Sequence, residues 1–119
     1  MMNMEVNGTK IQVKLYDNSS AEAVKDLLRK GPFTLSMKDY AHMEKFGSFG
    51  MQLPANDEPI TTEAGDVILS EGNLLVIYYA PNTWNFTRLG KVQNLSGEKL
   101  KKVLGKGSIT ATLTLDEEE

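Results

Sequence analysis

Residues 2–16 read MNMEVNGTKIQVKLY and carry the clearest structural signal in the chain. The dipeptide Asn7-Gly8 supplies the two positive-φ positions that a type I′ hairpin turn requires. Beyond the turn, apolar and polar residues alternate, which is the period of a strand with one buried face. These residues therefore predict an antiparallel hairpin with strands at 2–6 and 9–16.

Working outward from this hairpin, short apolar runs bounded by turn residues recur along the chain. They predict further strands at 33–37, 66–70, 74–79, 82–88 and 108–115. A turn at Glu71-Gly72-Asn73 joins two of them, so we expect a second hairpin turning at Gly72-Asn73. Strand 74–79 is apolar throughout, which predicts burial on both faces and a structural role. Residues 38–62 show no sustained period and are expected to be an irregular connection across one face or mouth of the fold.

Two segments carry helical signals. Ser19, with Glu22 three positions later, fits an N-terminal capping box and predicts a helix over 19–30. Ser96 has the side chain of an N-cap for a second helix over 96–104, which Gly105 would end. Seven or so strands and two helices, without βαβ alternation, predict a mainly antiparallel β barrel or sandwich.

The composition is that of one domain, and it excludes several kinds of site. The chain has 119 residues, of which 40% are hydrophobic and 24% charged, so we expect a single domain spanning 1–119. The absence of cysteine removes disulfides, thiolate metal sites and cysteine nucleophiles, and a single histidine removes any site with two imidazoles. The net charge of -3 gives no sign of a nucleic-acid footprint, so we expect no nucleic-acid partner. With one histidine and no ligand spacing in the sequence, we expect no metal and no cofactor.

No stretch approaches the ~20 apolar residues of a membrane-spanning helix, and the N-terminus lacks the regions of a secretory signal. We therefore expect a cytoplasmic protein with no membrane partner, although a secreted protein without its signal would look the same. The acidic residues 116–119 are expected to fray.

Five strings of residues, in their order and spacing, resemble a known family. They are FTLSMKDY (33–40), EKFGSFGMQLP (44–54), ITTEAGDVIL (60–69), NLLVIYY (73–79) and FTRLGKV (86–92). Together they resemble the cyclophilin-like fold, and more closely the small bacterial cyclophilin-like domain proteins that have no assigned activity. The resemblance covers nearly the whole chain and implies a closed, antiparallel, eight-stranded barrel with two capping helices.

The resemblance does not extend to prolyl isomerase chemistry. True cyclophilins carry a catalytic arginine in a segment of the form F-H-R, followed by F and then Q-G-G. The nearest counterpart here is 44–54, where Lys45 stands in place of an arginine and no Gly-Gly follows Gln52. A lysine cannot reproduce the rigid fork of a guanidinium. We therefore expect no efficient prolyl isomerase activity.

Large apolar side chains gather in the segments without a clear period, where they could line a binding groove. They are Tyr40, Phe46, Phe49, Met51 and Trp84. Arg88, next to the last of these, could clamp an anion at the edge of the groove, with Glu44 holding it when no ligand is bound. In the alternative, the aromatic residues only plug the barrel mouth and Arg88 pins a loop through Glu44 or Glu58.

The first interpretation predicts a binding module for a small molecule or an extended peptide. On this view Glu44→Gln would strengthen anion binding and Arg88→Ala would abolish it, whereas a neutral proline peptide would respond mainly to Phe46→Ala.

The other functional hypothesis is an enzyme of unidentified reaction, including weak prolyl isomerisation, that uses His42 or Arg88. His42 lies between Asp39 and Glu44 in the sequence, so acid–base work or a metal triad is conceivable, but a lone loop histidine is more often only solvated. No complete nucleophile–base or metal set is visible, which favours the binding module. The lysines of the second helix, Lys99, Lys101, Lys102 and Lys106, are expected to form a solubilising face.

Overall fold

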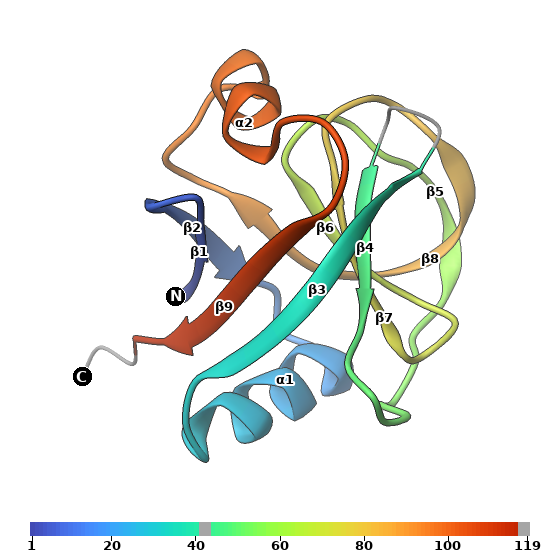
Figure 1. Cartoon of the computed structure of the whole chain (residues 1–119). Coiled ribbons are helices and arrows are strands. Elements are labelled where there is room, and N and C mark those ends of the chain that lie inside the picture. The colour runs from blue at the N-terminus through green and yellow to red at the C-terminus, as the bar shows by residue number, and fades with distance from the viewer. Residues whose placement is uncertain (41–43, 117–119) are drawn as a thin grey trace.

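The computed structural model of the protein describes residues 1–40 and 44–116, and within them it contains nine strands and two helices (Figure 1). The strands are β1 (Met2–Val6), β2 (Thr9–Leu15), β3 (Phe33–Tyr40), β4 (Glu44–Ser48), β5 (Glu58–Thr61), β6 (Asp66–Ser70), β7 (Leu74–Tyr78), β8 (Thr83–Val92) and β9 (Ile109–Leu115). The helices are α1 (Ser19–Arg29) and α2 (Gly97–Leu104).

The strands form a closed antiparallel barrel. Their order is β2-β1-β9-β3-β4-β7-β6-β8, and a pairing between β2 and β8 closes the ring, so eight strands make the barrel. The ninth, β5, pairs with the first part of β8 and lies outside the ring. The eight-stranded barrel with two helices implied by the resemblance is therefore confirmed.

The first hairpin forms as predicted. Val6 pairs with Thr9, and the two residues between them have φ angles of 50° at Asn7 and 79° at Gly8. The second hairpin forms through 71–73, but its turn is centred one residue earlier than expected: Glu71 and Gly72, and not Gly72 and Asn73, are its central residues and carry the positive φ angles. Because β1 also pairs with β9, the N-terminal strand lies inside the sheet.

Both helices occur where the sequence places them, with one correction at a cap. The N-cap of α1 is Asn18, whose Oδ1 accepts from the backbone N of Ala21 at 2.8 Å, and Ser19 is already helical. An asparagine oxygen fills this role as well as a serine hydroxyl does. The N-cap of α2 is Ser96, and Gly105 ends the helix at a φ of 64°.

The main core fills the barrel and extends to both helices. Its members include inward-facing residues of β1, β2, β6 and β7, together with Val24 and Leu28 of α1 and Leu100 and Leu104 of α2. Figure 1 shows the two helices at opposite ends of the barrel. Neither is long and apolar enough to cross a bilayer. Asp116, expected in a frayed tail, is instead bound by the side-chain amide of Asn3 at 2.7 Å, and 117–119 lie outside the described residues.

The segment 38–62 is more regular than its sequence pattern predicts. It contains the end of β3, all of β4 and all of β5. The period of β4 is hidden because its inward position is taken by a lysine, Lys45, and a glycine, Gly47. The inward face is therefore not apolar in sequence, and tertiary contacts decide the strand.

A second, smaller apolar cluster lies on the outer face of the sheet. In β7, Leu75 and Ile77 point into the barrel, whereas Val76 and Tyr78 point outward. The outward pair packs with Phe86 of β8 and with apolar residues of β5 and β6. The first part of β8, with β5 beside it, thus covers part of the outer face and creates the walls of a pocket.

Candidate functional site

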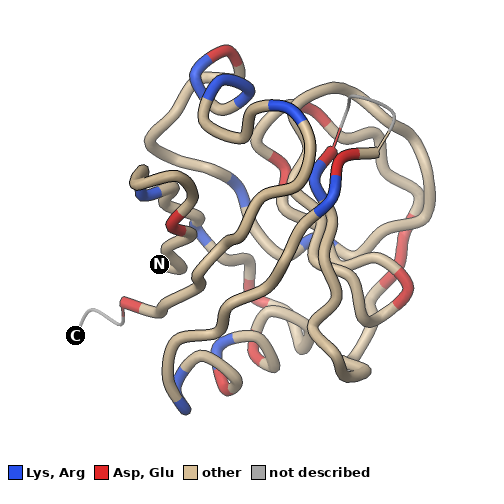
Figure 2. Tube along the Cα trace, viewed as in Figure 1, with Lys and Arg blue, Asp and Glu red and all other residues tan. Residues whose placement is uncertain are grey.

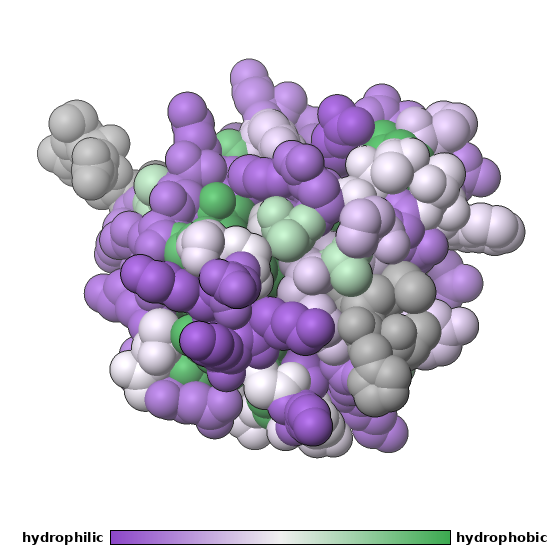
Figure 3. Space-filling model, turned by 90° about the horizontal axis from the view of Figure 1, so that it is seen from above, coloured by the Kyte–Doolittle hydropathy of each residue, from purple (hydrophilic) through white to green (hydrophobic). Residues whose placement is uncertain are grey.

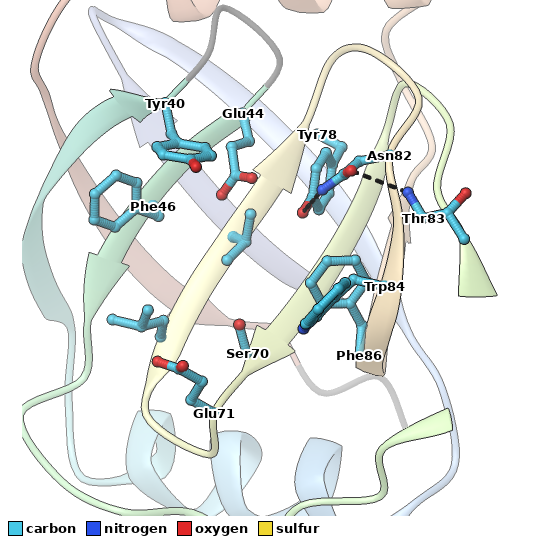
Figure 4. Close-up of a pocket in the computed structure, with 12 residues that line it drawn as sticks. Tyr40, Glu44, Phe46, Ser70, Glu71, Tyr78, Asn82, Thr83, Trp84 and Phe86 are labelled. Carbon is cyan, nitrogen blue, oxygen red and sulfur yellow. Dashed lines mark hydrogen bonds between the residues drawn. The ribbon is translucent and has the colours of Figure 1, made fainter. Parts of the chain in front are cut away.

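A pocket of about 630 Å³ lies on this outer face, between β4 and β7 on one side and β8 on the other (Figure 4). Its lining residues are Tyr40, Glu44, Phe46, Ser70, Glu71, Leu74, Val76, Tyr78, Asn82, Thr83, Trp84 and Phe86. The volume falls in the range of small-molecule sites, roughly 300–1,000 Å³.

Aromatic rings form two facing walls of the pocket. Tyr40 and Phe46 stand on one side in an edge-on arrangement with ring centres 6.4 Å apart. Trp84 stands on the other side, and Phe86 packs at 5.6 Å against Tyr78 below it. Tyr40 is 59% exposed and Trp84 68% exposed, so both rings are open to a ligand from solvent.

Glu44 lies between the two walls (Figure 4) and is only 8% exposed. Burial raises the pKa of its carboxyl above the usual value, and the nearby Asp39 carboxylate adds to this, while a hydrogen bond with Tyr78 lowers it. Burial is also the main reason that the pKa of the Tyr78 hydroxyl is raised. The Asn82 side-chain amide donates to that hydroxyl at 3.2 Å, which fixes the floor of the pocket.

The charge in the pocket is entirely negative. Glu44 and Glu71 are the ionisable carboxyls of its described lining, which includes no lysine or arginine. A buried carboxylate between aromatic rings attracts cations and amine donors and repels anions. The chemistry of the pocket is thus opposite to that of an anion clamp.

The structure brings together four of the seven residues that we selected from the sequence: Tyr40, Glu44, Phe46 and Trp84. Phe49 is 1% exposed and packs against Phe33 in the main core at a ring distance of 6.0 Å. Met51 is exposed on the loop after β4 but is not part of the pocket lining. The expectation that all seven share one concavity is therefore corrected.

Arg88 also lies elsewhere. It projects from β8 two positions beyond Phe86, where its Nε is 3.7 Å from Oε1 of Glu58, and it lines a separate hollow with Lys91 and Asp66. The predicted contact between Arg88 and Glu44 is wrong, and the alternative pairing with Glu58 is the one observed. The anion clamp consequently has no geometric basis.

Lys45, the counterpart of the isomerase arginine, points into the barrel and away from the pocket. It is 0% exposed, and its Nζ lies 3.2 Å from Oδ1 of Asp39 and 2.5 Å from the carbonyl oxygen of Gly107. The Tyr79 hydroxyl also donates to Asp39. His42 lies outside the described residues, and among those described no cluster of acidic or histidine side chains could hold a metal ion.

The sequence analysis missed several lining residues, chiefly Leu74, Val76, Tyr78 and Phe86. We had assigned the strand 74–79 a purely structural role because it is apolar throughout, but its outward residues form the back of the pocket. The tyrosine hydroxyl at Tyr78 is the one polar signal that distinguishes this face in the sequence. An apolar run conceals which of its two faces will meet a ligand.

Comparison with solved structures shows the same fold in two other proteins. McbB, solved in complex with tryptophan, matches all of this chain with a TM-score of 0.73 and 16% identity. The chain spans 46% of the length of McbB. The hypothetical protein AF2241 from Archaeoglobus fulgidus matches 93% of this chain and 91% of its own length, with a TM-score of 0.67 and 14% identity. At these identities the likeness is one of fold.

No curated protein shows a significant match to the sequence. The model of the cyclophilin-like family, in contrast, matches residues 4–115, which include both helices and all of the barrel strands except the first two residues of β1. The chain belongs to the cyclophilin-like family.

Proposed function

We propose that the protein is a binding module for a small molecule that combines a flat apolar body with an amino group. The observation that carries this proposal is the position of Glu44, a buried carboxylate between the exposed rings of Tyr40 and Trp84. The rings would hold the apolar body, and the carboxylate would accept hydrogen bonds from the amino group. A cation above an aromatic face gains further attraction, about 0.5–2 kcal/mol.

The comparison with McbB supports this class of ligand. That protein has been solved in complex with tryptophan, which combines a flat aromatic body with an ammonium group and a carboxylate. The fold is shared over the whole of this chain, although the chain covers just under half of McbB. An aromatic amine is therefore a reasonable first probe.

A direct test uses the single tryptophan of the chain, Trp84, as an internal reporter. Phenethylamine and 3-phenylpropionate have similar bodies and opposite charges, and neither emits in the tryptophan range. We expect saturable quenching of Trp84 by phenethylamine and weaker or no binding of 3-phenylpropionate at pH 7. Preferential binding of the anion would contradict the proposal.

Two variants and one control assign the contact. Glu44→Gln should weaken phenethylamine binding by about three- to tenfold, as expected for the loss of a partly desolvated charge pair. Phe46→Ala should weaken both probes because it removes part of the apolar wall. Arg88 lies outside the pocket, so Arg88→Gln should change the affinity for phenethylamine or for 3-phenylpropionate by no more than about twofold. Equal effects of Arg88→Gln and Glu44→Gln would mean that overall charge, and not the pocket, controls binding.

We also propose that efficient prolyl isomerase activity is absent, because Lys45 is bound to Asp39 inside the barrel and cannot reach a peptide in the pocket. A protease-coupled assay with a proline peptide measures this. A rate within about tenfold of a true cyclophilin would overturn the statement, since it would require a catalytic group other than the arginine fork.

A proton-transfer enzyme is the second candidate, and the raised pKa of Glu44 favours it. Conversion of a bound aromatic amine to a product would favour this candidate over a pure binding module. The turnover should be lost in Glu44→Gln at amine concentrations at which this variant, with Phe46 unchanged, still binds the amine. An enzyme site that uses Arg88 has less support, since Arg88 is outside the pocket.

A further inference from the structure

A second cavity, of about 730 Å³, lies at the end of the barrel that α2 covers. It is lined by Asp39, Tyr79, Glu98, Lys101, Lys102, Gly105 and Lys106. Neighbouring residues on the strands separate it from the first pocket: Tyr40 and Tyr78 face the first pocket, whereas Asp39 and Tyr79 face the second. The two cavities therefore lie on opposite faces of the same strands.

The charge of Asp39, on the floor of this second cavity, is balanced by an ion pair. Asp39 is paired with the buried Lys45 at 3.2 Å and also accepts from the hydroxyl of Tyr79. That pairing neutralises Asp39, which is the one acidic group on the barrel side among the described lining residues. The charge that a ligand would meet comes from the roof, where α2 and the turn after it carry three lysines and one glutamate, a formal sum of two positive charges.

The three lysines of the roof, Lys101, Lys102 and Lys106, have no carboxylate partner among the ion pairs of the described residues. Figure 2 shows the basic positions of α2 and the following turn gathered at this end of a protein whose net charge is -3. Seen from above in Figure 3, hydrophilic side chains at this end surround smaller areas of apolar surface. The Tyr79 ring and the lysine stems supply such apolar surface around the hollow.

We propose that this cavity binds a small organic anion, with the lysine ammonium groups on its phosphate or carboxylate and with Tyr79 against its apolar body. The site is distinct from the Glu44 pocket in place and opposite in charge. A solubilising role alone would require only that the lysines face water, as Lys99 does on the same helix, whereas Lys101, Lys102 and Lys106 converge on one hollow.

The test is a titration of the intact, isotope-labelled chain followed by amide chemical shifts, with three probes of one body: phenyl phosphate, benzoate and benzylamine. We expect both anions to shift the amides of Tyr79, Gly105 and Lys106 saturably with millimolar affinity, and benzylamine to shift those of Trp84 and Phe86 instead. A tighter fit of phenyl phosphate than of benzoate would assign the site to phosphate esters, and the reverse would assign it to carboxylates.

Three matched lysine variants distinguish binding in the cavity from a general attraction of anions to the basic surface of α2. Lys106→Gln and Lys102→Gln should each weaken the anions by about three- to fivefold, the effect of one exposed ion pair, whereas Lys99→Gln removes the same charge from α2 outside the cavity and should have less than a twofold effect. Equal losses in all three variants, or anion shifts that map to the Glu44 pocket or do not saturate, would overturn the proposal.

Discussion

At the scale of single residues, Glu44 shows how burial and function compete. Its carboxyl is placed among aromatic rings, where the neutral form is favoured, so its pKa in the folded protein lies above its value in the unfolded chain. A group of this kind contributes fully to stability below the unfolded pKa, near 4.5, and the contribution is lost as the pH rises through the folded pKa. The protein thus loses stability at neutral pH in order to keep a carboxylate in the pocket.

This sign gives a prediction for Glu44→Gln, which cannot ionise. The free energy of unfolding of the variant, relative to the parent, should be higher at pH 7 than at pH 4. Urea denaturation at the two pH values measures the difference, and the other titrating groups cancel because both proteins share them. A variant whose relative stability is the same at both pH values would show that Glu44 ionises freely in the folded state.

Lys45 illustrates the opposite case, a buried charge whose partners are all internal. Replacing it by methionine removes the charged partner of Asp39, which keeps only its other contacts such as the Tyr79 hydroxyl, and removes the donor to the Gly107 carbonyl, so Lys45→Met should lower the free energy of unfolding by about 3 kcal/mol. The exposed strand lysine Lys14 is the control, and Lys14→Met should change stability by less than about 0.5 kcal/mol. Asp39→Asn in the Lys45→Met background should recover part of the loss, as a urea-unfolding double-mutant cycle can measure. No recovery would mean that the pair is not coupled.

At the scale of elements, the hairpin between β1 and β2 depends on its turn conformation. Gly8 has a φ of 79°, and a Cβ added there would meet no atom within 4 Å, so a substitution costs backbone strain and not a clash. Gly8→Val should destabilise the protein by about 1 kcal/mol or more, whereas Gly8→Asn should cost less because asparagine tolerates this region. Thermal unfolding of both variants checks the order. Equal costs would indicate that the turn relaxes to another type.

The same elements show what a sequence can predict. The Asn7-Gly8 hairpin, the turn at 71–73 and the ends of α2 follow from local residue preferences, and each forms within one residue of where those preferences place it. β4 was missed because its inward residues are Lys45 and Gly47, which make sense only beside Asp39 and the backbone of β3. The inward and outward positions of β4 alternate in the folded barrel, but apolar and polar residues do not alternate in its sequence.

The candidate site was also predictable only in part. Large aromatic residues at Tyr40, Phe46 and Trp84 were suspected from their number in segments without a period, and the structure places them around one pocket. Arg88 could not be placed from sequence, because its neighbours across the sheet depend on the pairing of β8 with both β5 and β6. In the folded protein Arg88 pairs with Ile68 of β6 and its side chain lies near Glu58, outside the aromatic pocket.

At the scale of the whole molecule, closure of the barrel encloses one face of the sheet and leaves the other face outside. The inner face holds the main core and the outer face carries the second cluster, so each strand can serve two cavities with alternate residues. Closure depends on a short seam in which Val13, Lys14 and Leu15 of β2 pair with Val92, Lys91 and Gly90 of β8. Both pockets therefore depend on a seam that neither of them touches.

Gly90→Ala tests that dependence. An added Cβ would lie 2.6 Å from the carbonyl oxygen of Lys14 and 2.6 Å from Cγ1 of Val13, so the two strands would have to separate. We expect a loss of about 2 kcal/mol or more in the free energy of unfolding, measured by urea denaturation, with one cooperative transition because the seam joins the first hairpin to the rest of the barrel. Adding Val13→Ala removes the side-chain contact but leaves the approach to the Lys14 carbonyl, so it should not restore stability. Full recovery in that double variant would show that side-chain crowding, and not the backbone distance across the seam, requires glycine at this position.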